Sequence, residues 1–438
     1  MKINSIKIEN LFDIFSYDIS FKKEENVLII TGPNGFGKTM VLNIIFNLFN
    51  RQFLFFQKLV FEKITLNLDE NIKIVITKTI DAQKTKISFS FYEVNKDTEE
   101  DKEIETFDYS NKLETDFERN IQKYLPVRRI SPDKWTDLRT DRILSIDDLI
   151  NEYADQLPSE ISKGLLRIKS TKVNDILDSI QVHLIREQRL FKKAQNVDRN
   201  YREEKEQTIM TETIQTYAKE LKQLISEFSQ KSFIQTQELD SSYPNRLRSE
   251  TNILSEEEYE KKYNLLKNKQ SKLTEFGLYE SKQEFLTYSE DDAKALSVYL
   301  KDFELKLGVF DALLEKLELF TDILNERRFT FKTINVNRLK GFYFKTIKGK
   351  ELELNQLSSG EQHEVVLLYE LIFNVKPNIL VLIDEPEISL HITWQKEFLN
   401  DLLRIIKIQN IQVLIATHSP SIINDRWDLV YNLETAKN

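Results

Sequence analysis

The sequence predicts an α/β fold in which the two ends of the chain build one head and the middle forms a helical insertion. A glycine-rich loop, residues 32–39, lies between two apolar segments. A β-branched run, residues 379–383, ends in the acidic pair Asp384-Glu385, as expected for a buried parallel strand. From about residue 200 to 330 the chain is charged, poor in glycine and helical in period.

The glycine-rich loop reads Gly32-Pro33-Asn34-Gly35-Phe36-Gly37-Lys38-Thr39 and fits the pattern G-x-x-x-x-G-K-S/T of a phosphate-binding loop. The motif needs a preceding strand and a following helix. Residues 27–30 are an apolar run, and residues 40–46 have helical character. Three of the nine glycines in the chain fall within this loop. The sequence therefore predicts a nucleotide phosphate site here.

Each residue type in the loop has an expected role. Glycines let the backbone turn its N–H groups toward phosphate oxygens, and the helix N-terminus adds partial positive charge. We expect Asn34, Gly35 and Gly37 to contribute to this cradle. Lys38 would reach the β and γ phosphates, and Thr39 would be a ligand of Mg²⁺. ATP with Mg²⁺ is the predicted cofactor pair.

The acidic pair and a late histidine complete the predicted chemistry. Asp384 would hold Mg²⁺ through water, while Glu385 would orient and partly deprotonate the attacking water. Adjacent strand residues point to opposite faces, so the two carboxylates can serve different partners. His418 ends another apolar run, residues 411–417. A histidine at a strand end is often structural, but the motif order favours a hydrogen bond from His418 to the γ phosphate.

A further motif, Leu357-Ser358-Ser359-Gly360-Glu361-Gln362, has the pattern of a serine-capped helix start. It lies about twenty residues before the acidic strand, and in that position it resembles the signature motif of ATP-binding-cassette (ABC) ATPases. The resemblance is to the non-transporter branch, which includes structural-maintenance-of-chromosomes (SMC) ATPases, F-type recombination mediators and the overcoming-lysogenisation-defect (OLD) family.

The resemblance implies a bilobal P-loop ATPase head that works as a dimer. Ser358 and Gly360 would contact the γ phosphate held by the glycine loop of the other subunit. The family pattern often has glycine at the position of Ser359; serine there is common in OLD-like and defence ATPases and weakens the chromosome-structural assignment.

Two more family elements have candidates. Residues 387–391 match the communication loop that crosses the dimer interface in this family. Gln188 is the candidate for the family's lateral glutamine, because it immediately precedes the helical insertion. An exposed strand residue would explain Gln188 equally well.

The resemblance covers residues 1–195 and 331–438, which we predict as lobes I and II of the head, with residues 196–330 as a coiled-coil insertion. Heptads bury one seam against a partner helix. Two stretches have this spacing: Met210, Ile214, Tyr217, Leu221, Leu224 and Phe228, and Leu296, Leu300, Phe303, Leu307, Phe310, Leu314, Leu317 and Leu324, with Thr321 as a polar interruption. A weaker run is Tyr259, Tyr263, Leu266 and Leu273.

The apolar spacing in residues 196–330 predicts an antiparallel helical hairpin or a small helical bundle. A 30-residue helix extends about 45 Å, far less than a chromosome-structural arm. The chain has no cysteine, so it has neither a zinc hook at the arm tip nor a disulfide framework. A plain helical lid or dimerisation element also fits this segment.

Composition favours a soluble, cytoplasmic enzyme. No apolar stretch approaches the ~20 residues that cross a bilayer, and residues 1–8 alternate like a strand, unlike a signal peptide. A net charge of −9 does not indicate a dedicated nucleic-acid binder. Nucleic-acid contact stays open because basic residues cluster locally: Arg128, Arg129, Lys134, Arg139 and Arg142, and Lys163, Arg167, Lys169 and Lys172. The charged run 96–103 is expected to be a solvated hairpin loop.

The sequence thus predicts an ABC-type ATPase that forms at least a homodimer, with higher oligomers left open. The chain ends about twenty residues after His418, so we expect a stand-alone ATPase without the nuclease domain of OLD proteins. The resemblance extends to anti-phage defence ATPases of the PARIS, Septu and retron systems, most of all to the PARIS ATPase subunit. It implies a sensor that controls a separate effector, often a nuclease. The alternative is a DNA-repair ATPase that clamps on DNA; a transporter subunit fits less well.

Overall fold

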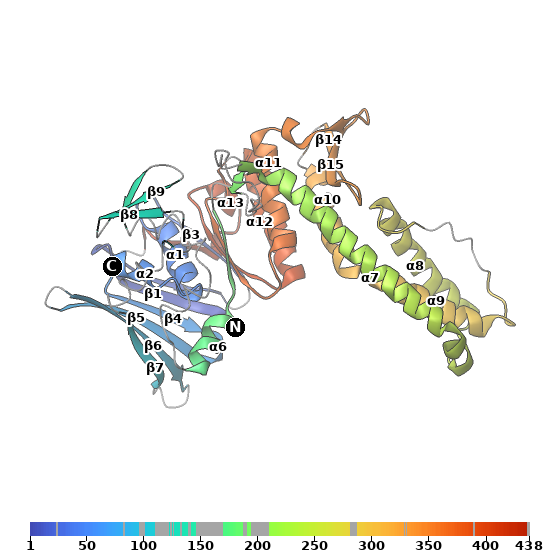
Figure 1. The fold of residues 1–438 in the computed structure, drawn as a ribbon, viewed down its shortest axis with the longest axis horizontal. Coiled ribbons are helices and arrows are strands. Elements are labelled where there is room, and N and C mark those ends of the chain that lie inside the picture. Colours follow the sequence, from blue (N-terminus) through green and yellow to red (C-terminus); the bar gives the residue numbers. More distant parts are fainter. Residues whose placement is uncertain are drawn as a thin grey trace.

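A computed structural model describes residues 1–22, 25–81, 84–95, 101–109, 122, 125, 127–131, 134–138, 142–145, 170–186, 191–193, 210–280, 287–327, 329, 331–388 and 390–435. It has an α/β head, at which both termini lie, and a helical arm that projects from it (Figure 1). Among the described residues, no helix has the length and apolar character needed to span a membrane.

A parallel sheet at the centre of the head joins the two ends of the chain. Its order is β11-β17-β18-β3-β19. The bounds are β3 Val27–Thr31, β11 Val182–Ile185, β17 Leu380–Asp384, β18 Gln412–Ala416 and β19 Val430–Asn432. Residues 380–383 of β17 and 413–416 of β18 are apolar and buried on both faces, as is usual for parallel strands. The carboxyl ends of β3, β17 and β18 therefore share one edge.

An antiparallel sheet of order β2-β1-β4-β5-β6-β7 forms the rest of lobe I. The bounds are β1 Ile3–Leu11, β2 Phe15–Ser20, β4 Lys63–Leu68, β5 Ile72–Asp81, β6 Lys84–Val94 and β7 Asp101–Tyr109, with helices α1 Lys38–Phe49, α2 Leu54–Lys58 and α6 Thr171–Ser179 and the short 3-10 turn η1 Asp69–Asn71. Residues 101–103 belong to β7 and not to a loop as predicted; residues 96–100 lie outside the described part.

Two hydrophobic cores meet at the parallel sheet because its side chains alternate between faces. Leu28 and Ile30 of β3 pack with α1 and the antiparallel sheet. Val27 and Ile29 of the same strand belong to the core that continues into lobe II and the arm. The parallel sheet thus separates the two cores and contributes side chains to both.

Smaller strands complete the described head. One sheet pairs β10 Ile143–Ser145, β9 Lys134–Asp137 and β8 Val127–Ser131, and another pairs β12 Phe191–Lys193 with β13 Met210–Glu212. Lobe II contains the sheet β14 Lys332–Asn337, β15 Gly341–Thr346 and β16 Glu351–Leu352. Its helical segments are η4 Leu354–Gln356, α11 Ser359–Tyr369, the π-helical η5 Glu370–Asn374, α12 Ile392–Gln409, α13 Pro420–Ile423 and η6 Trp427–Leu429.

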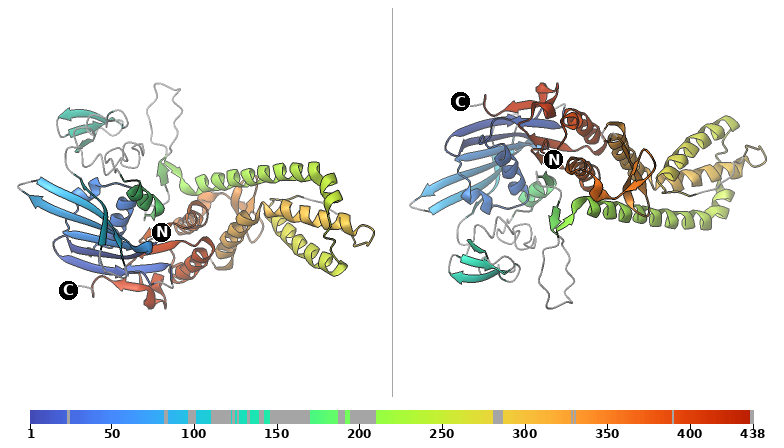
Figure 2. Two further views of the ribbon diagram at one scale, coloured as in Figure 1. Left: turned by 90° about the horizontal axis from the view of Figure 1, so that it is seen from below. Right: turned by 90° about the horizontal axis from the view of Figure 1, so that it is seen from above.

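The arm consists of α7 Thr213–Ser249, α8 Glu256–Glu275, α9 Ala293–Gly308 and α10 Asp311–Arg327. Both views in Figure 2 show these helices extending away from the sheets of the head. At 1.5 Å per residue, the 37 residues of α7 span about 55 Å.

The heptad residues bury the expected seam, with differences at both predicted stretches. Ile214, Tyr217 and Leu221 are buried on α7, whereas Met210 lies in β13 and not in a helix. The second stretch, predicted as one helix, is broken between α9 and α10. Gly308 ends α9, and glycine is a weak helix former, which explains the position of the break.

Candidate nucleotide-binding and hydrolysis site

The glycine loop follows β3 and leads directly into α1, as the motif requires. Gly35 and Gly37 have φ values of 87° and 83°, a left-handed conformation that only glycine adopts without strain. Gly37 is also the N-cap of α1 and has no side chain to occupy the first N–H groups of the helix. These groups and the helix dipole make the start of α1 suited to an anion. Asn34 and Gly35 are exposed at the loop surface.

Aromatic residues of β2 support the loop from behind. The Tyr17 hydroxyl donates a hydrogen bond of 2.8 Å to the Phe36 carbonyl. The rings of Phe15 and Phe36 lie 5.3 Å apart. Burial raises the pKa of Tyr17 to about 12, so its hydroxyl keeps its proton and stays a donor. This support was not predicted from the sequence, because β2 has no motif.

Lys38 is buried at the base of the loop, with 5 % of its side chain exposed. Its ammonium donates to the carbonyls of Gly32 at 3.0 Å and Pro33 at 3.4 Å. Glu385 Oε1 lies 3.7 Å from the same nitrogen. The ammonium is therefore placed between the phosphate loop and the acidic strand, where it can bind phosphate oxygens of a nucleotide.

The predicted magnesium residues are in direct contact although 345 positions separate them in the chain. The Thr39 hydroxyl donates a hydrogen bond of 3.0 Å to Asp384 Oδ1. Hydroxyl and carboxylate oxygens are the hard ligands that Mg²⁺ prefers, and it commonly keeps several waters beside one or two protein ligands. The two side chains therefore fit a magnesium ion bound partly through water and nucleotide.

Glu385 lies just beyond the end of β17, and its backbone is in the left-handed region at φ 45°. Its N–H donates to the Ala416 carbonyl at 2.9 Å. A non-glycine residue in this conformation is strained, and such strain gathers at functional sites. Strand alternation was the predicted reason why the two carboxylates separate. The structure gives a different reason, since the chain turns sharply at Glu385.

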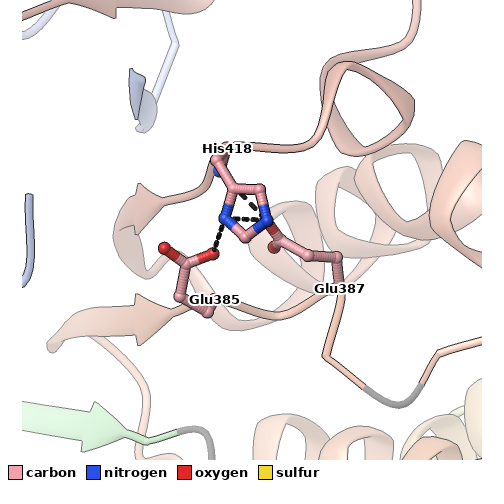
Figure 3. Close-up of side chains that lie close together, drawn as sticks. All are labelled: Glu385, Glu387 and His418. Carbon is pink, nitrogen blue, oxygen red and sulfur yellow. Dashed lines mark hydrogen bonds and ion pairs between the residues drawn. The ribbon is translucent and has the colours of Figure 1, made fainter. Parts of the chain in front are cut away.

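His418 meets two carboxylates at the end of β18 (Figure 3). Its Nδ1 lies 2.5 Å from Glu385 Oε2 and 3.3 Å from Glu387 Oε1. About half of the imidazole, 52 %, is exposed. The histidine is therefore close to the predicted base and also accessible from outside, as contact with a nucleotide would require.

Glu387 is a residue of this site to which the sequence assigned no role of its own. Its Oε1 accepts hydrogen bonds from the Thr417 hydroxyl at 2.6 Å and from the His418 and Ser419 N–H groups at 3.0 and 3.1 Å. Its side chain is only 6 % exposed. Glu387 thus fixes the turn that carries His418. One sign of this role is present in the sequence, because Glu387 closely follows a buried strand in Asp384-Glu385-Pro386-Glu387. A glutamate buried at that position needs hydrogen-bond donors.

The electrostatics of the cluster centre on Glu385. Burial and the adjacent Glu387 carboxyl raise the pKa of Glu385 to about 7, against the opposing effect of His418 and Lys38. A carboxyl with a pKa near neutrality can accept a proton from water, as a general base must. Ligand atoms of Glu385, Glu387 and His418 also lie within 4.8 Å of one another, so the cluster could hold a cation.

The signature residues lie in lobe II. Ser358 is the N-cap of α11, and Gly360 is in its first turn. Among the described residues, Ser358 hydrogen bonds run to Glu361 and Gln362 of its own turn. The structure therefore brings together Lys38, Thr39, Asp384, Glu385 and His418, and it leaves Ser358 and Gly360 in a separate element.

Two other predicted elements have different outcomes. Gln188 lies outside the described residues. In the segment matched to the communication loop, His391 is the N-cap of α12 and bonds the Thr393 hydroxyl at 2.8 Å. That contact gives His391 a structural role in this conformation.

A phosphate loop, a threonine–aspartate pair and an acidic–histidine cluster at the carboxyl edge of one parallel sheet define a P-loop ATPase head. The chain belongs to the AAA ATPase domain family, whose model matches residues 1–423. No curated protein matches the sequence.

Two solved structures are similar to the whole chain at low identity. One is the SMC head domain from Thermotoga maritima, with 11 % identity, 99 % of this chain and 94 % of that chain covered, and a TM-score of 0.33. The other is an SMC head bound to the C-terminal winged-helix domain of ScpA, with 10 % identity, 97 % and 91 % covered, and a TM-score of 0.34.

Proposed function

We propose that the chain is a magnesium-dependent enzyme that hydrolyses ATP to ADP and phosphate. The observation that carries this proposal is the meeting of Lys38 and Thr39 from one end of the chain with Asp384, Glu385 and His418 from the other. These groups supply phosphate binding, metal ligands and a base within one edge of the sheet. We call these five residues the catalytic edge.

We assign each side chain of the catalytic edge a role in ATP hydrolysis. Lys38 and the loop N–H groups bind the β and γ phosphates. Thr39 and Asp384 would hold Mg²⁺, which when bound would supply positive charge against the charge developing on the phosphates. Glu385 orients a water and accepts its proton, for which a pKa near 7 is suitable. His418 donates to the γ phosphate, and Glu387 keeps His418 in place.

We further propose a homodimer in which the signature residues complete the site of the partner. Ser358 and Gly360 lie at an N-terminus of α11, which favours negative charge. Ser358 is exposed, and its contacts among the described residues stay in its own turn. The resemblance of the motif to the ABC signature supports a second subunit as the source of the γ phosphate. ATP would then close the dimer, and hydrolysis would open it.

The proposed biological role is a cytoplasmic, nucleotide-switched sensor in anti-phage defence that controls a separate effector protein. The support is the resemblance of the motif series to defence ATPases, together with a short arm. About 55 Å for α7 suits a surface that holds a protein partner better than one that spans chromosomal DNA. The nuclease or other toxin would be a different chain.

The experiment is mass spectrometry of material that co-purifies with tagged Glu385→Gln protein, expressed with its neighbouring genes. Nuclease-treated and untreated samples run in parallel, and Lys38→Ala protein is the nucleotide-free control. A protein that co-purifies in stoichiometric amount after nuclease treatment, and with only one of the two variants, supports a complex with an effector whose binding depends on the nucleotide. DNA without a protein partner would favour the alternative.

The alternative is a DNA-repair or recombination ATPase that clamps on DNA, and one observation favours it. Arg128, Arg129 and Lys134 are exposed on the β8–β9–β10 sheet, and Arg142 is exposed directly before β10. Phosphate contacts make binding depend steeply on salt. Fluorescence anisotropy with a labelled duplex tests this function: binding that falls with salt and with Arg128→Glu plus Lys134→Glu supports it, and no binding at low salt refutes it.

A further inference from the structure

Lys332 is the first residue of β14 and forms a two-oxygen ion pair with the signature turn, residues 358–362. Its ammonium lies 2.7 Å from Glu361 Oε1 and 2.8 Å from Oε2. The pair is largely shielded, with 25 % of the lysine and 16 % of the glutamate side chain exposed. Burial opposes ionisation of Glu361, but Lys332 and the Ser358 turn outweigh it and keep the pKa of Glu361 below its usual range.

Glu361 is in turn bonded to the signature serine. Its Oε2 accepts from the Ser358 N–H at 2.8 Å and from the Ser358 hydroxyl at 3.1 Å. The Glu361 N–H donates back to the hydroxyl oxygen at 3.3 Å, which completes a capping box. The Ser358 hydroxyl, which would donate to a phosphate, thus donates to the Glu361 carboxylate in this structure. That carboxylate is in turn paired with the Lys332 ammonium.

We propose that Lys332 is a positioning residue of the composite ATP site: it neutralises Glu361 and fixes the signature turn, so that Ser358 can meet a γ phosphate. This rests on the proposed function, because it assumes that Ser358 serves a nucleotide bound by a partner subunit. A negative carboxylate about 3 Å from the serine would repel a γ phosphate, and a paired cation removes that repulsion.

The strand β14, which begins with Lys332, lies where the arm joins the head (Figure 1). The Asn325 side chain on α10 bonds both backbone groups of Ile334 in β14, accepting from its N–H at 2.8 Å and donating to its carbonyl at 3.2 Å. Gly341, at the start of β15, has φ 73° and touches α7: a Cβ there would lie 1.9 Å from the Ala218 carbonyl oxygen. The β14–β15 hairpin, which carries Lys332, therefore contacts both the outgoing helix α7, through Gly341 of β15, and the returning helix α10, through Ile334 of β14.

A displacement of the arm at its junction with the head therefore moves Lys332. That movement changes the distance between the Lys332 ammonium and the Glu361 carboxylate, and with it the net charge beside Ser358 in the signature turn. Two bonds to Asn325 and the close Gly341 contact leave β14 little freedom to stay behind. A partner bound along the arm would thereby alter hydrolysis in the neighbouring subunit's site without touching the nucleotide.

The first test is a double-mutant cycle on ATP turnover. Lys332→Met keeps the length of the side chain, removes its charge and should lower kcat about tenfold or more. The affinity of the glycine loop for a fluorescent ATP analogue should stay within about twofold. Adding Glu361→Gln should restore much of the lost rate, because the unpaired charge is gone. Lys340→Met, which breaks the exposed pair between Lys340 and Glu351 of β16 in the same sheet, is the matched control and should leave kcat unchanged.

A kcat of Lys332→Met equal to that of the parent would overturn the proposal. So would a Lys332→Met/Glu361→Gln protein as slow as Lys332→Met alone, because damage to packing would not be relieved by removing the carboxylate. Circular dichroism melting of each variant shows that the compared proteins are folded.

The second test mixes subunits. Lys332→Met and Lys38→Ala proteins are each slow alone, but a mixed dimer has one site with an intact glycine loop facing an intact signature turn. ATPase activity above either parent supports action of Lys332 across the interface. The reference mixture, Ser358→Ala with Lys38→Ala, tests the composite site itself.

The reference mixture separates two failures. If it regains activity and the Lys332→Met mixture does not, Lys332 acts within its own subunit and this inference is wrong. If neither mixture regains activity, the proposed composite site is wrong.

Discussion

The catalytic edge and the signature turn both contain charged side chains that are partly shielded from solvent. The two regions differ in where the partners of their polar side chains come from. At the catalytic edge the functional side chains contact one another, with Lys38 3.7 Å and His418 2.5 Å from Glu385. In the signature turn, Ser358 is satisfied by Glu361 three residues away. The first region is thus assembled by the fold of one chain. The second is complete as a helix start, and the further role that we propose for it requires a partner subunit.

The largest effect should come from the cation of the catalytic edge. Lys38→Ala removes the only charged side chain of the glycine loop and should weaken ATP binding by more than about 100-fold. Isothermal titration with ATP and Mg²⁺ measures it. Lys7→Ala, which removes an exposed lysine of β1, is the control and should bind as the parent does. Parental affinity in Lys38→Ala would break the assignment of the phosphate site.

Removing the base should separate binding from hydrolysis. Glu385→Gln keeps the shape of the side chain but cannot accept a proton, so turnover should fall about 100-fold or more while ATP stays bound. Single-turnover hydrolysis of radiolabelled ATP reports the chemical step. A Glu385→Gln protein that hydrolyses at the parental rate would refute the role of Glu385.

The joint between arm and signature turn should be intolerant of a single methyl group. Gly341→Ala combines a left-handed backbone with an overlap on the Ala218 carbonyl, and we expect it to cost about 2–4 kcal/mol of unfolding free energy. Urea denaturation measures this loss. Gly349→Ala is the matched control: it has a similar φ of 79° but open space around the Cβ, so it should cost about 1 kcal/mol. Equal costs would show that the contact with α7 is unimportant.

The smallest effect concerns pH. Only ionised Glu385 can act as base, and a pKa raised to about 7 makes the rate climb between about pH 6 and 8. Glu387→Gln keeps the acceptor for Thr417 but removes the negative charge that helps raise this pKa. The midpoint of the rate profile should therefore move to lower pH by about one unit. An unchanged or higher midpoint would contradict the electrostatic coupling.

The sequence predicted those parts of the site whose chemistry depends on local motifs. The glycine loop, Asp384 and His418 are recognisable because backbone turns and strand ends constrain the residues at fixed spacing. Their meeting at one edge followed from parallel strands with a shared direction, which the pairing of β17, β18 and β3 bears out.

The parts that sequence reasoning missed depend on tertiary contacts. Glu387 has a role only because the segment between β18 and α13, residues 417–419, presents three donors to it. The Lys332–Glu361 pair joins residues 29 positions apart on different elements. Heptad spacing continued through Gly308, since periodicity records which face is buried but not where a helix ends. The separation of Asp384 and Glu385 was predicted from strand alternation, whereas β17 ends at Asp384 and the chain turns at Glu385, whose positive φ is invisible in a run of strand residues.

The central claim, that the signature turn of one subunit faces the glycine loop of another, is tested most directly by cross-linking. The chain has no cysteine, so Asn34→Cys and Ser359→Cys can be placed singly in two separate Glu385→Gln proteins. Both positions are exposed. After mixing with ATP, Mg²⁺ and a short bis-maleimide, we expect a covalent dimer of one chain with the other, and none when Lys38→Ala is added to both. ATP-bound protein that gives no cross-linked dimer would contradict it.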